Sequence, residues 1–295
     1  MSCHVMKTIP AEEEEEGLGI RVKRTIGGSK MDYLDPFLQL DHFQAQKPSC
    51  MPDHPSRGFQ TVTYMLQGSI KYSDFCGNVG TVTPGDVQVV SSGCGMVYSE
   101  SPVSDDEAVG IQLYVNISEK DKLSLPGYQY TSVQDIPEVV IQDGIKVSVV
   151  LGEAFSSKCT SNCITPVNIC DVTIATDRHL EIPVQPDWSV LIYILSGKLI
   201  IGPPSNTRVV LSQEAAVISK GDDLHIENKG TDPCRFLLMT GKCLGEEISR
   251  QGSFVMNTEE DIRQTIKDYH LRKNGFERAT DWSSTTGLEY LDSQF

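Results

Sequence analysis

The sequence lacks long apolar runs and an excess of basic residues. No apolar stretch approaches the ~18 residues that a membrane-spanning helix needs, so we expect no membrane association. Lysine and arginine number 25 against 40 aspartates and glutamates, which gives a formal net charge of −15. Because contacts with phosphates need a basic face, this balance argues against direct binding of nucleic acid. It is compatible with a basic protein partner.

The marks of a secreted protein are also absent. Met1–Pro10 contain no apolar core of the kind found in signal peptides, so we expect that the protein is not secreted. Nine cysteines are an odd number in a long chain, which indicates free thiols in a reducing compartment. Cys159, Cys163 and Cys170 lie close together in the sequence, but no second cluster completes four zinc ligands. We interpret them as buried thiols.

The chain begins with an acidic stretch and then becomes strand-like. Residues 1–17 end in five consecutive glutamates, Glu12–Glu16. Because like charges repel and stay solvated, we predict a flexible acidic arm over residues 1–17. Strand patterns start at Ile20. Phe59–Leu66 alternates and is rich in β-forming residues, and a turn follows at Gln67 and Gly68.

The second half of the chain repeats motifs of the first half in the same order. Three pairs of segments correspond: Tyr64–Ile70 with Tyr193–Leu199, Pro84–Asp86 with Lys220–Asp222, and the strand at Ile111 with Arg235–Met239. The first pair is separated by 129 residues. Such a repeat predicts two copies of one all-β unit, each a small barrel or jelly roll.

The repeat also sets the predicted domain boundaries. We expect an N-terminal barrel over residues 18–120 and a C-terminal barrel over residues 146–250. The charges and prolines of residues 121–145 indicate a linker. Residues 251–295 contain one predicted helix, which begins at a capping pattern of Thr258 and Asp261 and carries Ile262, Ile266 and Tyr269 on one face.

Two short stretches carry the candidate functional site. In each, two potential ligand side chains stand two residues apart: His54 with Ser56, and Tyr98 with Glu100. Residues i and i+2 of a β-strand point to the same face. If the two strands adjoin in a barrel, all four side chains converge on its interior, which is a geometry for holding a metal ion. Only His54 and Glu100 are ordinary metal ligands.

Seven ordered motifs between about Gly19 and Trp282 match one known family: Pro52–Tyr64, Asp74–Gly77, Pro84–Asp86, Gly110–Leu113, Gly152–Glu153, Gly252–Asn257 and Asn274–Glu277. They resemble the pirin family. The resemblance implies a bicupin, with two tandem cupin (jelly-roll-type) β-barrels and a C-terminal segment that packs back on the N-terminal barrel. It also implies one iron ion (Fe2+/Fe3+) in the N-terminal barrel, quercetin 2,3-dioxygenase-type activity and, in eukaryotes, nuclear transcriptional co-regulation.

The chain departs from the pirin pattern at the metal site. That pattern places ligands as His-x-His in the first motif and His-x-Glu in the second. His54 and Glu100 therefore match ligand positions, whereas Ser56 and Tyr98 replace histidines. Cys94 replaces the usual arginine between two glycines. We predict that iron binding is weakened or lost.

Three states of this site follow from the residue chemistry. In the first, Tyr98 fills the space of the metal and an imidazole, and its hydroxyl bonds Glu100 or Ser56. In the second, His54 and Glu100 still hold a metal together with Tyr98 and water. In the third, contacts with a substrate or partner compensate. Neutral hydroxyls bind Fe(II) weakly, and a tyrosinate forms only if its pKa of about 10 is lowered.

Two functions are therefore open. The first is a regulatory protein of the co-regulator type, a monomer in the nucleus or cytoplasm that binds transcription-related proteins. The alternative is a metal-dependent enzyme in which His54 and Glu100 act on a flavonol-like phenolic substrate. We assign no catalytic residue and no further cofactor. Cys94 is a candidate reactive thiol if it is exposed near a cation.

Other histidines and one arginine near the motifs receive structural interpretations. His42 is expected at a barrel rim or in a loop, and Arg57 in an ion pair with Asp53 or Asp86. The C-terminal barrel contains His179 with Glu181 and His225 with Glu227, both at strand spacing. By the 129-residue repeat, the positions equivalent to His54 and Ser56 are instead Pro183 and Gln185. We therefore expect no second metal site.

Overall fold

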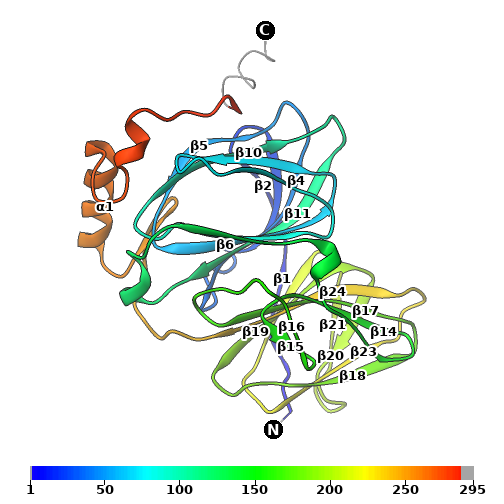
Figure 1. Ribbon diagram of the computed structural model, residues 1–295. Helices are drawn as coiled ribbons and strands as arrows, with labels where there is room; N and C mark the ends of the chain where they lie inside the picture. Colours follow the sequence, from blue (N-terminus) through cyan, green and yellow to red (C-terminus); the bar gives the residue numbers. More distant parts are fainter. Residues whose placement is uncertain (1, 287–295) are drawn as a thin grey trace. The chain divides into compact units, whose positions relative to one another are not determined.

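The computed structural model describes residues 2–286, which fall into two compact units. The first, which we call the C-terminal barrel, combines Met1–Glu12, Thr25–Pro36 and Gln134–Cys243. The second, which we call the N-terminal barrel, combines Glu13–Arg24, Phe37–Val133 and Leu244–Phe295. Strands dominate both units, and the prediction of an all-β fold with two barrels and one short C-terminal helix is confirmed (Figure 1). No helix of the described part is long and apolar enough to cross a membrane.

The N-terminal barrel is built from a seven-stranded sheet in the order β12-β9-β6-β11-β4-β3-β2 and a four-stranded sheet in the order β5-β10-β7-β8. The strands are β2 (Glu12–Glu16), β3 (Ile20–Ile26), β4 (Phe37–Ala45), β5 (Met51–Ser56), β6 (Phe59–Gln67), β7 (Ile70–Asp74), β8 (Val79–Val82), β9 (Val87–Ser91), β10 (Met96–Pro102), β11 (Ala108–Asn116) and β12 (Gly127–Thr131). The pairings among β4 to β12 are antiparallel.

The C-terminal barrel repeats this plan. Its seven-stranded sheet has the order β1-β22-β19-β24-β17-β14-β13, and its four-stranded sheet the order β18-β23-β20-β21. The strands are β1 (Val5–Pro10), β13 (Glu138–Gln142), β14 (Ile145–Leu151), β17 (Val167–Ile174), β18 (Arg178–Pro183), β19 (Trp188–Ser196), β20 (Lys198–Ile201), β21 (Arg208–Leu211), β22 (Glu214–Ile218), β23 (Asp223–Asn228) and β24 (Cys234–Lys242). A hairpin of β15 (Glu153–Ala154) and β16 (Ser157–Lys158) joins β14 to β17.

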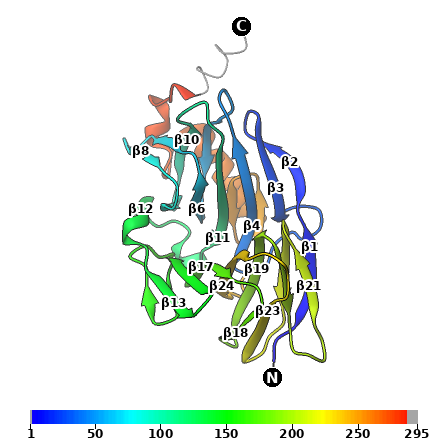
Figure 2. The same cartoon turned by 90° about the vertical axis from the view of Figure 1, so that its right-hand side faces the viewer.

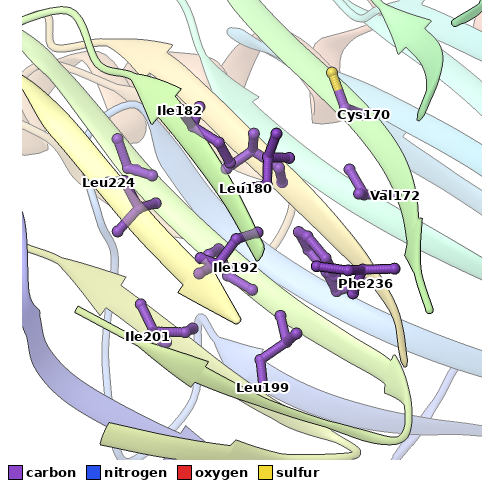
Figure 3. Packing of buried hydrophobic residues seen from close by; sticks show 14 of the residues in the cluster. Cys170, Val172, Leu180, Ile182, Ile192, Leu199, Ile201, Leu224 and Phe236 are labelled. Carbon is purple, nitrogen blue, oxygen red and sulfur yellow. The ribbon is translucent and has the colours of Figure 1, made fainter. Parts of the chain in front are cut away.

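The interior of the C-terminal barrel is almost entirely aliphatic. On β18, Leu180 and Ile182 are buried while His179 and Glu181 are exposed, which is the period of two that a strand with one solvated face requires. Leu180 and Ile182 point toward Ile192 and Phe236 of the larger sheet (Figure 3). Burial of such side chains supplies the main stabilising free energy of the barrel.

The register of strand pairing shows that the two barrels correspond residue by residue. In the N-terminal barrel, Tyr64 of β6 lies opposite Ile111 of β11. In the C-terminal barrel, Tyr193 of β19 lies opposite Leu237 of β24. The sequence repeat is thus a structural repeat.

Residues 1–17 differ from the predicted flexible arm, because they contain two paired strands. β1 pairs with β22, and β2 is the edge strand of the N-terminal barrel sheet. Alternate side chains of a strand face opposite sides, so only Glu12, Glu14 and Glu16 share the less exposed face. Arg24 donates hydrogen bonds to Glu14 Oε2 at 2.8 Å and to Glu16 Oε2 at 2.6 Å, which offsets the repulsion between these carboxylates.

The predicted linker, residues 121–145, is also more ordered than its composition suggested. It contains β12, which pairs with β9, and β13, which pairs with β14. Two 3-10 turns, η1 (Glu119–Asp121) and η2 (Val133–Asp135), flank β12. The boundary between the two units falls at Val133, inside this segment.

The C-terminal segment belongs to the N-terminal barrel. It contains β25 (Ser249–Gln251), β26 (Phe254–Met256), helix α1 (Glu259–Leu271) and the 3-10 turn η3 (Glu277–Thr280) (Figures 1 and 2). The capping box of Thr258 and Asp261 is present, and Arg272 ends the helix in the left-handed conformation. Ile262 is buried with Phe254 and Phe276 in one hydrophobic cluster.

Candidate functional site

The two strands that carry the candidate site are direct neighbours. β5 and β10 pair antiparallel, with Tyr98 opposite His54 and Met96 opposite Ser56. The register then shifts, so that Glu100 lies opposite Met51. The extra residue lies on β5, between Met51 and His54, because β10 keeps an unbroken register with β7 through Tyr98 and Glu100. As the i and i+2 spacing predicted, strand pairing brings His54, Ser56 and Tyr98 together.

Tyr98 packs directly against His54. The two ring centroids lie 4.1 Å apart with an interplanar angle of 57°. Tyr98 is only 3% exposed, and burial, with further contributions from Tyr114 and Glu100, raises its pKa well above the ordinary value for tyrosine. The phenol therefore stays protonated across the physiological range. A neutral phenol is a poor metal ligand, because it is the tyrosinate that binds iron well.

His54 keeps part of a ligand's geometry. Its Nδ1 lies 2.9 Å from the carbonyl oxygen of Pro52, and because a carbonyl only accepts, Nδ1 is the donor. Burial lowers the pKa of His54, so the ring is neutral at pH 7 and Nε2 carries a lone pair. A backbone carbonyl that fixes the tautomer is typical of metal-binding histidines, but it serves a packed histidine equally well.

Ser56 is an orphaned polar group. Its side chain is buried, and although Oγ lies near enough to the Tyr98 hydroxyl to offset a small part of the rise in the pKa of that phenol, it makes no hydrogen bond of good geometry among residues 2–286. An unpaired buried hydroxyl costs roughly 1–3 kcal/mol of stability. A serine Oγ also reaches less far than an imidazole nitrogen, so Ser56 is a poor substitute for a histidine ligand.

Glu100 is buried and has Gln112 as its hydrogen-bond partner. It is 8% exposed, and Gln112 Nε2 donates to its Oε2 at 3.3 Å. Burial raises the pKa of Glu100 to about 7, and the bond from Gln112 offsets this only in part. The carboxyl group also lines a cavity of about 30 Å³ together with Glu16 and Asp41. That volume suits one or two water molecules.

The residues present do not fit the iron site of the family pattern. Two imidazoles and a carboxylate are the usual set for non-haem Fe(II), and here one imidazole, one carboxyl group with a raised pKa and two neutral hydroxyls replace them. In the part of the chain that the structure describes, no group of three or more histidine, cysteine, aspartate or glutamate side chains is arranged to hold a metal ion. The structure brings His54 to Tyr98, whereas Glu100 is bonded to Gln112.

Sequence reasoning missed Gln112 and Tyr114 as parts of this site. Tyr114 Oη donates to Gln112 Oε1 at 3.4 Å, so the two side chains form a chain of hydrogen bonds that ends at Glu100. Both stand on β11 at i and i+2, the same spacing that identified the other pairs. Because neither is an ordinary metal ligand, a search for ligands passes over them.

Arg57 does not pair with Asp53 or Asp86, as the sequence had suggested. It donates to Asp268 Oδ2 of α1 at 2.9 Å, and also to Thr265 and the carbonyl oxygens of Cys94 and Asn274. Its guanidinium lies 4.7 Å from the centroid of the Phe276 ring. The arginine is a structural anchor for the C-terminal segment, and the prediction of an ion pair was right while its partner was wrong.

The remaining predicted residues occupy structural positions. His42 lies on β4 and is half-buried, and burial lowers its pKa to about 4. Cys94 is half-buried in the turn before β10. In the C-terminal barrel, Glu181 Oε1 and His225 Nδ1 are 2.5 Å apart on neighbouring strands. This is a polar pair on the surface of the barrel.

Two tandem antiparallel barrels of this topology define a bicupin, a member of the cupin class. A family model described as Pirin matches residues 19–115, and one described as Pirin C-terminal cupin domain matches residues 169–275. The chain is 39% identical to Pirin of Homo sapiens over 287 residues, covering 97% of this chain and 99% of that protein. It is 40% identical to a Pirin-like protein of Solanum lycopersicum over 280 residues, covering 95% and 96% respectively. The chain belongs to the pirin family.

Solved structures agree with this assignment. Quercetin 2,3-dioxygenase from Acinetobacter baumannii superimposes with a TM-score of 0.84 at 25% identity, covering 94% of this chain and 99% of that one. The bacterial pirin YhhW from Escherichia coli, solved in complex with nickel(II), gives a TM-score of 0.66 at 16% identity, covering 81% of this chain and 99% of that one. The latter likeness shows the fold alone.

Proposed function

We propose that this chain is a pirin-family bicupin whose metal site is weakened or lost, and that it acts as a regulatory protein through binding other proteins. The role is of the transcriptional co-regulator type, in the nucleus or cytoplasm. The observation that carries the proposal is the packing of Tyr98 on His54 at 4.1 Å, with the phenol buried and protonated. It supports the state in which a side chain takes the place of the ligands.

Two further features support this proposal. Glu100 accepts a hydrogen bond from Gln112 Nε2 at 3.3 Å, so its carboxyl group has a partner within the barrel. The net charge of −15 suits association with basic surfaces of protein partners. Both fit a barrel that serves as a scaffold.

A second candidate is a metal-dependent oxidoreductase of the quercetin 2,3-dioxygenase type that acts on a flavonol-like substrate. It is favoured by one observation, the bond of His54 Nδ1 to Pro52 that leaves Nε2 available. The name of the Acinetobacter baumannii neighbour points the same way. This candidate needs His54 and Glu100 as its ligands, and we derive no reaction step from the donor set present.

The experiment that separates the two restores the ligand set of the pirin pattern. We compare the wild type with the double variant Ser56→His/Tyr98→His by anaerobic calorimetric titration with Fe(II). We expect no stoichiometric binding by the wild type and about one metal per chain in the double variant, with affinity raised at least roughly tenfold because two imidazoles complete the set. Adding His54→Ala to the double variant is the matched control and removes the gain.

Two results would contradict the lost site. The first is wild-type binding as tight as that of the double variant, and the second is flavonol turnover by the wild type that His54→Ala abolishes. A folded double variant that binds no better than wild type would show instead that the positions of Ser56 and Tyr98 no longer correspond to ligand positions. The protein-binding role predicts that any partner stays bound in a chelating buffer.

A further inference from the structure

The C-terminal barrel contains a much larger cavity than the one beside Glu100 in the N-terminal barrel. Its volume is about 450 Å³, against about 30 Å³ for the cavity beside Glu100. Lining residues come from β17, β18, the segment after β18, the start of β19, β24 and the β15–β16 hairpin. Glu153 and Gln185 at its edge are exposed while Cys170 and Leu238 are buried, so the cavity leads from solvent into the barrel. A volume between about 300 and 1,000 Å³ is that of small-molecule sites.

Strand register shows that residues lining this cavity are equivalent to Gln112, Tyr114 and Asp41 of the N-terminal barrel. Thr240 of β24 lies opposite Asn168, and Leu238 lies opposite Cys170. The equivalent pairs on β11 and β4 are Tyr114 with Gln39 and Gln112 with Asp41. The two β4 residues precede their β17 counterparts by 129 residues, and the two β11 residues precede their β24 counterparts by 126 residues.

The exchange of side chains at equivalent positions contributes to the difference in volume. Where the N-terminal barrel has the ring of Tyr114, the C-terminal barrel has the small side chain of Thr240. Where the first has Gln112 and Asp41, the second has Leu238 and Cys170. One barrel is filled by an aromatic ring and polar groups, and the other is left open with a more apolar wall.

The wall is suited to an aromatic ligand. Apolar surface comes from five side chains: Phe155, Ile182, Val184, Trp188 and Leu238. Two of the lining residues, Cys170 and Ile182, are labelled in Figure 3. Two aromatic side chains offer stacking or edge contacts to a ring. Among residues 2–286, the ionisable groups that line the cavity are Glu153 and the buried thiol of Cys170, and no lysine or arginine lines it. Burial raises the pKa of Cys170 to about 12, so that thiol is uncharged. An anionic group inside the cavity would meet no cation of its lining, and Lys158 at the exposed edge is already paired with Glu153.

The Thr240 hydroxyl is a hydrogen-bond donor that lines the cavity, and its neighbours fix its orientation. Asn168 Oδ1 accepts from the backbone N–H of Glu153 at 2.9 Å, which fixes the amide. Asn168 Nδ2 then donates to Thr240 Oγ1 at 3.3 Å. Because this hydroxyl already accepts, its own proton is directed elsewhere, and Thr240 is half-buried against the cavity.

We propose that the C-terminal barrel binds an uncharged aromatic small molecule in this cavity, with an acceptor group such as a carbonyl on the Thr240 hydroxyl. The ring lies among Phe155, Trp188 and Leu238. This site is independent of the metal positions of the N-terminal barrel and stands whether or not they bind iron.

The test uses 6-propionyl-2-(dimethylamino)naphthalene, a neutral aromatic ketone whose fluorescence reports polarity. We expect saturable binding at one molecule per chain, with energy transfer from Trp188. The chain has two tryptophans, so the background variant Trp282→Phe assigns the signal to Trp188. Absence of saturable binding would overturn the proposal.

Variants at Thr240 locate the probe. Thr240→Tyr installs the residue of the other barrel and fills the cavity, so binding should disappear. Thr240→Val keeps the shape and removes the donor, and should weaken binding about fivefold, the loss of one ordinary hydrogen bond. Tyr114→Phe in the N-terminal barrel is the control and should leave binding unchanged. If Thr240→Tyr does not fold, Val184→Trp fills the same cavity from the segment after β18.

A matched pair of probes tests the class of ligand. N-phenyl-1-naphthylamine and 1-anilinonaphthalene-8-sulfonate share one ring system and differ in a sulfonate charge. We expect the sulfonate to bind at least about tenfold more weakly, because it must lose hydration without a cation to meet it. Equal affinities, or a probe that stays bound in both filled variants, would contradict the proposed site.

Discussion

At the scale of single residues, the environment of each side chain decides what its chemistry can be. His54 and Glu100 have the atoms of metal ligands, yet one packs against a phenol and the other accepts a hydrogen bond from Gln112. Tyr98 is held in its protonated form by burial. The three side chains therefore behave as a packed polar cluster in this structure.

Glu100→Gln should make the protein more stable at pH 8 and not at pH 5. The pKa of Glu100 is about 7 in the folded protein against 4.5 as the ordinary value, so the native state holds the proton more tightly. The stabilisation is complete below about pH 4.5 and is lost as the pH rises through about 7, which amounts to roughly 3 kcal/mol. Glutamine does not ionise and avoids this loss. Urea unfolding at both pH values measures the difference.

The control for removing one negative charge is Glu13→Gln, at an exposed position of β2. Its effect on stability should be below about 0.5 kcal/mol. If Glu100→Gln instead destabilises the protein at pH 8, the ionised carboxylate is held by a cation, and the description of this site is wrong.

The sequence predicted the site in part, for a reason visible in particular residues. Spacing of two on strands was enough to bring His54 and Tyr98 together. It could not show that Gln112 donates to Glu100, because Gln112 stands on a separate strand, β11, whose position in the barrel the spacing of two does not give. Nor could it show the partner of Arg57, which lies 211 residues away in the chain.

At the scale of elements, helix α1 is attached to the N-terminal barrel by a buried ion pair. Arg57 and Asp268 side chains are 3% and 7% exposed. Although burial alone would raise the pKa of Asp268, hydrogen bonds from Arg57, Asn274 and Gln264 hold it below its ordinary value. The carboxylate is thus ionised and paired at neutral pH.

Asp268→Asn should therefore destabilise the protein by about 3–5 kcal/mol, since it leaves the buried guanidinium without a counter-charge. Guanidinium chloride unfolding measures the loss, and hydrogen exchange should show it first in α1. Arg263→Ala is the matched control, because Arg263 pairs with Glu259 and Glu260 on the exposed side of the same helix. That variant should have little effect on stability, because the pairs of Arg263 are exposed to solvent. Equal effects of the two variants would contradict the anchoring role.

Local signals predicted α1 well and the first strands poorly. The capping box is a short-range pattern, so Thr258 and Asp261 located the start of the helix correctly. The glutamates of β2 form a strand because Arg24, on the neighbouring strand, lies beside Glu14 and Glu16. Such tertiary contacts outweigh the tendency of consecutive charges to stay solvated. They cannot be predicted from the five glutamates alone.

At the scale of the whole molecule, each barrel takes strands from distant parts of the chain. β1 completes the large sheet of the C-terminal barrel, although more than 120 residues separate it from the next strand of that sheet. The internal repeat predicted two barrels, but it could not predict this contribution, since β1 lies outside the repeated motifs.

Ile9→Ala should thus destabilise the C-terminal barrel. Ile9 lies on β1, is 1% exposed and pairs in register with Ala215. Its truncation should cost about 2–5 kcal/mol, the range for a buried aliphatic side chain. Met6→Ala on the same strand, where the side chain is 68% exposed, is the control and should have little effect. Thermal unfolding compares them, and equal melting temperatures would mean that residues 1–17 are the flexible arm that the sequence suggested.

The most direct test of the central claim, that the metal site of this pirin-family bicupin is weakened or lost, is the metal content of the purified wild-type protein. The protein is incubated anaerobically with Fe(II), desalted and measured by elemental mass spectrometry. With Tyr98 packed on His54 and Glu100 bonded to Gln112, we predict far less than one iron per chain. A value near one iron per chain, lost in His54→Ala, would contradict the account.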